Sequence, residues 1–282
     1  MWEEGDANME NEHKTLNEYK TLNEYKTLNE YKTLIEERQA HIRLSVQDGA
    51  KYAILPGDPG RIDHIKKFLT DAKELQYNRE MRSASGYYKG IKILAVSTGM
   101  GGASTGITVE ELRNIGVEYM IRIGSCGALD PSIRLGDLVL VNGAVRDDGA
   151  SKAYIEPVYP AIPDTRLLMA TIRSAEEKGF PFHIGKARSH DSFYTDKEEA
   201  IDAYWSAKGI LGADMETAAL FTIGALRGVK CASILNTVVE FEADLKQNIN
   251  DYVDGESIVK QGEENEIITA LEAFVIQNNT NN

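Results

Sequence analysis

The stretch IKILAVSTGMGGASTGITVEELRNIGVEYMIRIGSCGAL, residues 91–129, decides the fold of this chain. It opens on an apolar run at 91–96 that ends in a glycine-rich loop, and a helix is expected over 103–114. A second apolar run at 119–123 ends in a segment of small residues, 124–127, which is expected to be another loop. The order predicts two strands joined by a helix, each followed by a tight loop. In open α/β sheets, small ligands bind in the crevice beyond such strand ends.

Arg122 lies within the second apolar run, where a charge is unusual. A buried guanidinium needs an anionic partner, because an unpaired buried charge costs several kcal/mol. That partner could be an acid of this chain, which has 44 Asp and Glu residues. It could instead be a phosphate that Arg122 holds together with Ser125 and the backbone amides of 124–127. Both interpretations stay open from the residues alone.

The composition bounds the class of protein. With 282 residues, 42% of them hydrophobic and 27% charged, the chain is typical of a globular protein with a sizeable core. Its net charge of −13 argues against general binding to nucleic acids or anionic membranes. The two cysteines, Cys126 and Cys231, provide neither a disulfide framework nor metal-ligand spacing. Without a long apolar run or a signal peptide, a cytoplasmic protein with no metal is expected.

Residues 1–40 differ from the rest of the chain. The hexapeptide TLNEYK at 15–20 recurs at 21–26 and 27–32. A six-residue period turns through about 600° in a helix, so that successive leucines point to different faces and no coiled-coil seam forms. We expect a low-complexity repeat appendage, disordered or a frayed helix, that carries no chemistry. Residues 41–282 show no break in composition and are expected to form one domain.

Strands and helices alternate from residue 51 onward. Strands are expected at 52–55, near Leu75, and at 91–96, 119–123, 138–141, 182–189 and 229–236, and helices near Arg61 and at 103–114, 165–178, 196–203, 215–226 and 257–275. The prolines and glycines of 146–163 predict a loop there, and Asp214 is expected to cap the helix that follows it. The alternation predicts a single-domain, three-layer α/β/α fold around a central mixed, mostly parallel sheet.

Three short motifs carry possible chemistry. The turn GDPGR at 57–61 lies between a strand and a helix, where amides and an arginine could bind an anion, although a plain turn with a solvated arginine is an equal alternative. The glycine loop at 99–102 lacks the third glycine of a dinucleotide fingerprint, and no Gly-Lys-Ser/Thr follows it. Redox cofactors and nucleoside triphosphates are therefore disfavoured. The acids of Asp214-Met215-Glu216 could cap a helix or accept hydrogen bonds from sugar hydroxyls.

With these residues placed, the chain resembles the nucleoside phosphorylase family, of the uridine phosphorylase and hexameric purine nucleoside phosphorylase type. The resemblance covers roughly residues 41–275. It is carried by motifs in the same order: PGDPGR (56–61), NREMRS (78–83), STGMGGAST (97–105), RIGSCGAL (122–129), RDDGAS (146–151), SHDSFY (189–194) and ADMETAAL (213–220). The resemblance implies a nucleoside-phosphorylase-like fold and phosphorolysis, in which phosphate attacks C1′ of a nucleoside and releases free base and ribose 1-phosphate. Phosphate is then a co-substrate, and no cofactor is expected.

The resemblance also implies roles for individual residues. For phosphate it implies Gly57, Arg61, Arg122 and Ser125, joined by Arg79 of a neighbouring subunit. For ribose it implies Met215 and Glu216, joined by His41 of the neighbour, and for the base Cys126, Gly127, Phe193, Lys197 and Glu199. The candidate catalytic residues are Arg122, Glu216 and Glu240. Sites shared in this way imply a homodimer as the smallest active unit, within a homohexamer.

The match is poorest at the base. The uridine branch carries a Gln-x-Arg pair after the FY motif, where this chain has Lys197 and Glu199. The purine branch ends its last strand with a general-acid aspartate, and aligning 237–240 with that motif places Glu240 there, whereas an alignment on Asn236 does not. Because RDDGAS and the following EPVYPAIPD are closer to the uridine branch, uridine phosphorylase-like activity is the leading expectation. A purine nucleoside phosphorylase, a nucleosidase that uses water and a non-catalytic binding protein are the alternatives.

Overall fold

The computed structural model describes residues 37–243 and 257–280. The expected repeat appendage therefore lies outside the described residues, except for its last four positions. The strands are β1 (Tyr52–Pro56), β2 (Thr70–Asn78), β3 (Met81–Tyr88), β4 (Ile91–Val96), β5 (Tyr119–Ala128), β6 (Leu138–Asp147), β7 (Phe182–His190), β8 (Ile210–Asp214) and β9 (Lys230–Val239). The helices are α3 (Arg61–Lys66), α4 (Gly102–Asn114), α5 (Gly149–Tyr154), α6 (Thr165–Lys178), α7 (Glu198–Ser206), α8 (Thr217–Leu226) and α10 (Ser257–Thr280).

The described strands form one mixed sheet of nine strands in the order β2-β3-β4-β1-β5-β8-β7-β6-β9. Five of its strand pairings are parallel and four are antiparallel. Because β9 also pairs with β5, the strands β5, β8, β7, β6 and β9 close into a ring. The predicted α/β class is confirmed, but the closure of the sheet was not predicted from the sequence.

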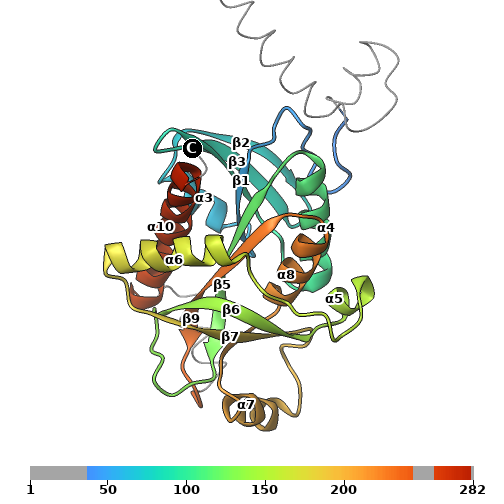
Figure 1. The fold of residues 1–282 in the computed structure, drawn as a ribbon. Coiled ribbons are helices and arrows are strands. Elements are labelled where there is room, and N and C mark those ends of the chain that lie inside the picture. Colours follow the sequence, from blue (N-terminus) through green and yellow to red (C-terminus); the bar gives the residue numbers. More distant parts are fainter. Residues whose placement is uncertain (1–36, 244–256, 281–282) are drawn as a thin grey trace, which may run out of the picture. The chain divides into compact units, whose positions relative to one another are not determined.

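Two apolar cores lie against the sheet. Side chains alternate between the faces of a strand, and along β5 Met120 and Cys126 belong to one core while Ile121 and Ile123 belong to the other. The first core includes side chains of α4 and α8, and the second includes side chains of α3, α6 and α10. Figure 1 shows α10 and α4 on opposite sides of the strands. The strand β5 is thus covered by helices on both faces.

The expected loop at 124–127 is wrong, because β5 continues through these small residues to Ala128. Ser125 and Cys126 pair with Asn236 and Thr237 of β9, and Gly127 pairs with β8. The backbone N–H and C=O groups of a loop would have formed hydrogen bonds with water. Here, strands more than eighty residues later in the chain provide those hydrogen-bond partners. The end of β5 is thus paired on both sides where a tight loop was expected.

Three further expectations differ from the structure. The helix predicted from Met215 begins at Thr217, although Asp214 does accept a hydrogen bond from the Thr217 amide, at 3.0 Å. The segment expected to be a loop over 146–163 contains α5, which Asp148 caps through the Ser151 amide, and its three prolines all follow the end of that helix. The short strand β8 was not predicted. Its five residues form a strand because they pair with β7 and β5.

Candidate active site

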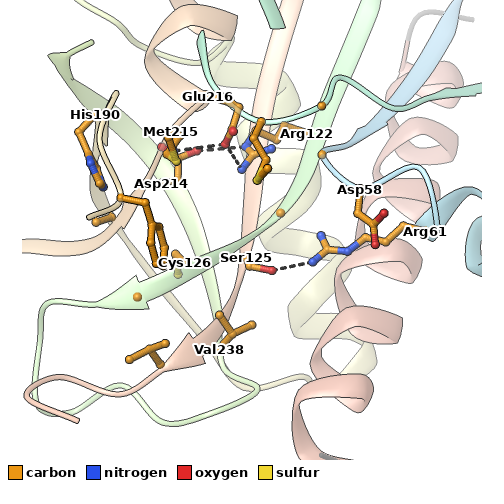
Figure 2. Close-up of a pocket in the computed structure, with 18 of the residues that line it drawn as sticks. Asp58, Arg61, Arg122, Ser125, Cys126, His190, Asp214, Met215, Glu216 and Val238 are labelled. Carbon is orange, nitrogen blue, oxygen red and sulfur yellow. Dashed lines mark hydrogen bonds and ion pairs between the residues drawn. The ribbon is translucent and has the colours of Figure 1, made fainter. Parts of the chain in front are cut away.

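A cavity of about 500 Å³ lies next to the carboxyl ends of β1, β5, β8 and β9. Its size is within the usual range for small-molecule sites. Many of the predicted site residues line it, namely Gly57, Arg61, Arg122, Ser125, Cys126, Gly127, Phe193, Met215 and Glu216. Figure 2 shows Arg61 and His190 on opposite sides of this cavity. The cavity occupies the position beyond the strand ends where the sequence predicts a ligand crevice.

Arg122 is held on β5 with only 4% of its surface exposed. Alternation along the strand places it on the face of Met120, toward α8. There its Nε lies 3.0 Å from Oδ2 of Asp214, and its Nη2 lies 2.5 Å from Oε2 of Glu216. Burial by itself lowers the pKa of Arg122, but the two carboxylates more than offset this and raise it. Arg122 therefore has the internal acidic partners that one interpretation of the sequence required.

One nitrogen of Arg122 nevertheless has no hydrogen-bond partner among the described residues. Nη1 is buried and makes no hydrogen bond with any residue in the described part of the chain. A Cβ atom built on Gly57 would lie 3.8 Å from this nitrogen, so the backbone of Gly57 faces it. A buried donor without a partner costs about 1–3 kcal/mol. An anion between Gly57 and Arg122 would remove that cost, which is the second interpretation of the sequence.

Arg61 approaches the end of β5 from the other face. Ser125 occupies the same side of the strand as Ile123, and its Oγ accepts a hydrogen bond of 2.6 Å from Nη2 of Arg61. Arg61 is 4% exposed and forms ion pairs with Glu263 and Glu266 of α10. Two buried arginines, one from each face of the sheet, thus flank the end of one strand (Figure 2). Paired guanidinium groups of this kind are suited to recognise phosphate.

Glu216 occupies the position just before α8 and turns its carboxylate back into the cavity. Oε1 accepts a hydrogen bond of 2.6 Å from the amide of Gly101, and Oε2 accepts one of 3.2 Å from the amide of Met215. Burial raises the pKa of Glu216, with Arg122 opposing and Asp214 adding to the increase. Two carboxylates share a single guanidinium here. Glu216 is a fixed, partly compensated acceptor, which is the group needed to bind a sugar hydroxyl.

Phe193, His190 and Cys126 line the far end of the cavity. His190 is a residue that the sequence analysis did not select. Its Nδ1 lies 2.9 Å from the carbonyl oxygen of Ser192, and because a carbonyl can only accept, Nδ1 carries the hydrogen. Burial, reinforced by Arg188, lowers the pKa of His190, so the ring is neutral near pH 7 and Nε2 is an acceptor. Burial also raises the pKa of the Cys126 thiol to about 12, which leaves it protonated and unreactive.

Five predicted residues do not line this cavity. Arg79 is exposed, with a positive φ of 56° in the turn between β2 and β3, and His41 bonds Glu111 of α4 at 2.7 Å. Both were expected to reach a neighbouring subunit, and their positions relative to this cavity do not test that expectation. Lys197 and Glu199 are exposed at the start of α7. The carboxylate of Glu240 accepts a hydrogen bond of 3.3 Å from the Leu135 amide and does not face the cavity.

Sequence reasoning missed several residues of the site. Asp214 was expected to cap a helix or to bind a sugar hydroxyl, yet it anchors Arg122 and also accepts a hydrogen bond from Ser189. Val238 and Val239 line the cavity because β9 ends three residues later than predicted, at Val239 instead of Asn236. The available signal for Asp214 was its position two residues before Glu216, whereas nothing in the local sequence marks the valines.

Two features are absent from residues 37–243 and 257–280. No group of three or more His, Cys, Asp or Glu side chains there could hold a metal ion. Among the same residues, no helix is both long and apolar enough to cross a membrane.

Comparisons with known proteins agree with this geometry. A profile described as the phosphorylase superfamily matches residues 51–260. A uridine phosphorylase of Thermococcus kodakarensis is 38% identical over 219 residues, covering 72% of this chain and 79% of that protein. A guanosine phosphorylase of Halorubrum lacusprofundi is 36% identical over 197 residues, covering 70% and 81%. The crystal structure of uridine phosphorylase from Vibrio fischeri superposes with a TM-score of 0.80 at 45% identity, covering 86% of this chain and 98% of that one. This chain therefore belongs to the phosphorylase superfamily.

Proposed function

We propose that this protein is a nucleoside phosphorylase of the uridine phosphorylase type, a pentosyltransferase that uses inorganic phosphate as co-substrate. The observation that carries the proposal is the buried Arg122, whose Nη1 lacks a partner in the described part of the chain and faces Gly57. A phosphate oxygen bound beside Gly57 would accept the hydrogen bond that this nitrogen can donate. The presence of Arg61 and Ser125 at the same strand end supports the choice of phosphate.

The proposed reaction needs little more than positioning and charge. Phosphate bound by Arg61, Arg122 and Ser125 attacks C1′ of the ribose, and the bond from C1′ to the base breaks with its electron pair leaving on the base. Positive charge develops on the sugar as that bond lengthens, and the nearby phosphate dianion stabilises it. The carboxylate of Glu216 orients the sugar through its hydroxyls. Arg122 and Glu216 are thus the catalytic residues of the proposal, and no covalent nucleophile is required.

The base end supports a uridine-like substrate more than a purine. A purine enzyme of the expected type needs an acid at the end of β9, and Glu240, the candidate, is turned to the Leu135 amide. Phe193 offers a ring for the base to stack on, and Nε2 of His190 offers an acceptor for an N–H of the base. Purine phosphorolysis remains the second candidate because a guanosine phosphorylase is among the relatives.

We further propose that active sites are shared between subunits, in a dimer-based hexamer. Ribose would then receive His41, and phosphate Arg79, from a neighbouring copy. The exposure of Arg79 in its turn supports a role outside its own chain. His41 is partly exposed and its ring is oriented by Glu111, as a hydrogen-bonding residue at an interface would be.

A nucleoside panel assayed with and without phosphate tests the function. Phosphate-dependent release of uracil from uridine, with ribose 1-phosphate formed in equal amount, is the expected result. Phosphate-dependent cleavage of inosine or guanosine but not uridine would support the second candidate. Release of base in phosphate-free buffer would identify a nucleosidase, and no release under either condition would indicate a binding protein.

A further inference from the structure

A third buried acid, Glu266, lies behind the phosphate end of the cavity on α10. Its side chain is completely buried, and it does not line the cavity. Oε2 accepts a hydrogen bond of 3.0 Å from the amide of Gly124 on β5. Oε1 lies 3.2 Å from Nη1 of Arg61. Glu266 therefore connects two elements of the proposed phosphate site, the end of β5 and the arginine of α3.

Three charged groups act on Glu266. Arg61 faces it from α3, Arg122 acts on it from β5, and Glu263 lies one turn earlier on α10. Glu263 is itself 3.3 Å from Nε of Arg61 and also pairs with His64. When Glu266 is ionised, Arg61 is therefore already balanced by two carboxylates before any ligand binds. A phosphate dianion added beside Arg61 would bring further negative charge into a buried acidic surrounding.

Uptake of a proton would relieve this excess of negative charge. Burial, reinforced by Glu263 and opposed by Arg61 and Arg122, raises the pKa of Glu266 to about 8. The group therefore changes charge near physiological pH, unlike an ordinary glutamate. When neutral, Glu266 can still accept from the Gly124 amide, but it no longer holds Arg61 by charge.

We propose that Glu266 is a positioning residue that couples phosphate binding to the uptake of one proton, because its neutral form releases Arg61 toward the bound anion. The inference rests on the proposed function only in taking phosphate as the ligand of Arg61. It predicts that anion affinity falls as the pH rises past the titration of Glu266. For one linked proton, the dissociation constant rises about ten-fold per pH unit once Glu266 is ionised in the free protein.

Calorimetric titration of the full chain in buffers with different ionisation enthalpies tests the proposal. Sulfate is the first probe because it does not titrate in this range, and inorganic phosphate is the second. At pH 8 the binding of sulfate to the wild-type protein should take up about half a proton. Sulfate binding without proton uptake would overturn the inference, and this measurement needs no variant.

Two variants assign the proton to its residue. Glu266→Gln keeps the size of the side chain and an acceptor for the Gly124 amide, and it should bind sulfate without proton uptake and with little change in affinity between pH 7 and 9. Glu272→Gln changes an acid on the same helix that pairs with Lys89 and should behave as the wild type does. Unchanged proton uptake in Glu266→Gln would assign the proton elsewhere and refute the proposal. If the wild-type protein showed no phosphate-dependent turnover, the proposed function would be refuted instead. Failure of the proton-coupling proposal and failure of the proposed function are therefore distinguishable.

Discussion

Nη2 of Arg122 lies 2.5 Å from Oε2 of Glu216, so that the residue proposed for phosphate and the residue proposed for ribose form one buried ion pair. Each orients the other in the absence of substrate. The pair arises because position 122 of β5 faces α8, directly before which Glu216 lies. A change at either residue is therefore expected to affect both the stability of the fold and the chemistry of the site.

Glu216→Gln should lower kcat/KM for the preferred nucleoside by about 10- to 100-fold, because a hydrogen bond to a charged group contributes about 1.5–3 kcal/mol. The amide is close in size to the carboxylate and can still accept from the Gly101 amide, so the fold should be retained. Steady-state kinetics measure the effect. Glu110→Gln, at an exposed ion pair with Arg227, is the matched control and should change kcat/KM by less than about two-fold. Equal kinetics in the two variants would remove Glu216 from the site.

Arg122→Met should destabilise the protein by roughly 3–5 kcal/mol, because it leaves the carboxylates of Asp214 and Glu216 buried without compensation. Arg122→Lys keeps the charge and should lose less stability, but it should also lose phosphate-dependent turnover, since an ammonium cannot bind the acids and a phosphate oxygen with the same geometry. Urea unfolding compared between the three proteins measures the first effect. A Met variant as stable as the wild type would show that Arg122 is not the only compensation for these acids.

His190→Phe should raise KM for the nucleoside several-fold near pH 7, because it removes the acceptor Nε2 while keeping a ring at the base end of the cavity. In the wild type, the lowered pKa of His190 keeps the ring neutral at pH 7. Protonation at lower pH turns Nε2 into a donor, so KM should rise in the wild type as the pH falls through that pKa, and this rise should be absent in the variant.

His183→Phe provides the comparison for His190, because His183 lies on the same strand and pairs with Asp137 away from the cavity. KM profiles between about pH 5 and 8, where an unperturbed histidine titrates, are the readout. An acidic rise in KM that persists in His190→Phe would show that another group causes it.

Much of the fold was predictable because it depends on local patterns. The apolar runs of β1 and β4 and the helix period of α6 show where strands and helices lie, and a charge in the apolar β5 run selected Arg122, which lines the cavity, as a candidate. Short motifs also selected Arg61, Ser125 and Glu216, which line the cavity, and the resemblance then assigned a role to each. These predictions needed no knowledge of which strands pair.

What could not be predicted depends on contacts between distant parts of the chain. Residues 124–127 resemble a loop locally and become a strand only because β8 and β9 pair with them. Asp214 lies 92 residues from Arg122, and Glu266 is one acid among many until α10 packs behind β5. The base end was predicted least well, because the residues expected at the start of α7 do not line the cavity, whereas His190 of β7 and two valines of β9 do.

Gly124→Ala tests whether the end of β5 is shaped for the guanidinium of Arg122. A Cβ atom at this position would lie 2.4 Å from Nη2 and 2.6 Å from Cζ of Arg122, closer than any packed contact allows. The backbone of β5 is fixed by its pairing with β9, so the flexible side chain of Arg122 must move away from Glu216 and Gly57. We therefore expect kcat/KM to fall by about 100-fold or more, since a displacement of about 1 Å in a site can have that effect.

The fold of the Gly124→Ala protein should survive, because the three atoms nearest to the added methyl group all belong to the far end of the Arg122 side chain. Gly143→Ala on β6 is the matched control, since its Cβ atom would meet neighbours only at 3.8 Å and 3.9 Å. Both variants should unfold cooperatively, whereas only Gly124→Ala should lose phosphate-dependent turnover. If Gly124→Ala retained wild-type kinetics, the guanidinium would have room to shift without cost, and the position of Arg122 seen here would not be the one that catalysis requires.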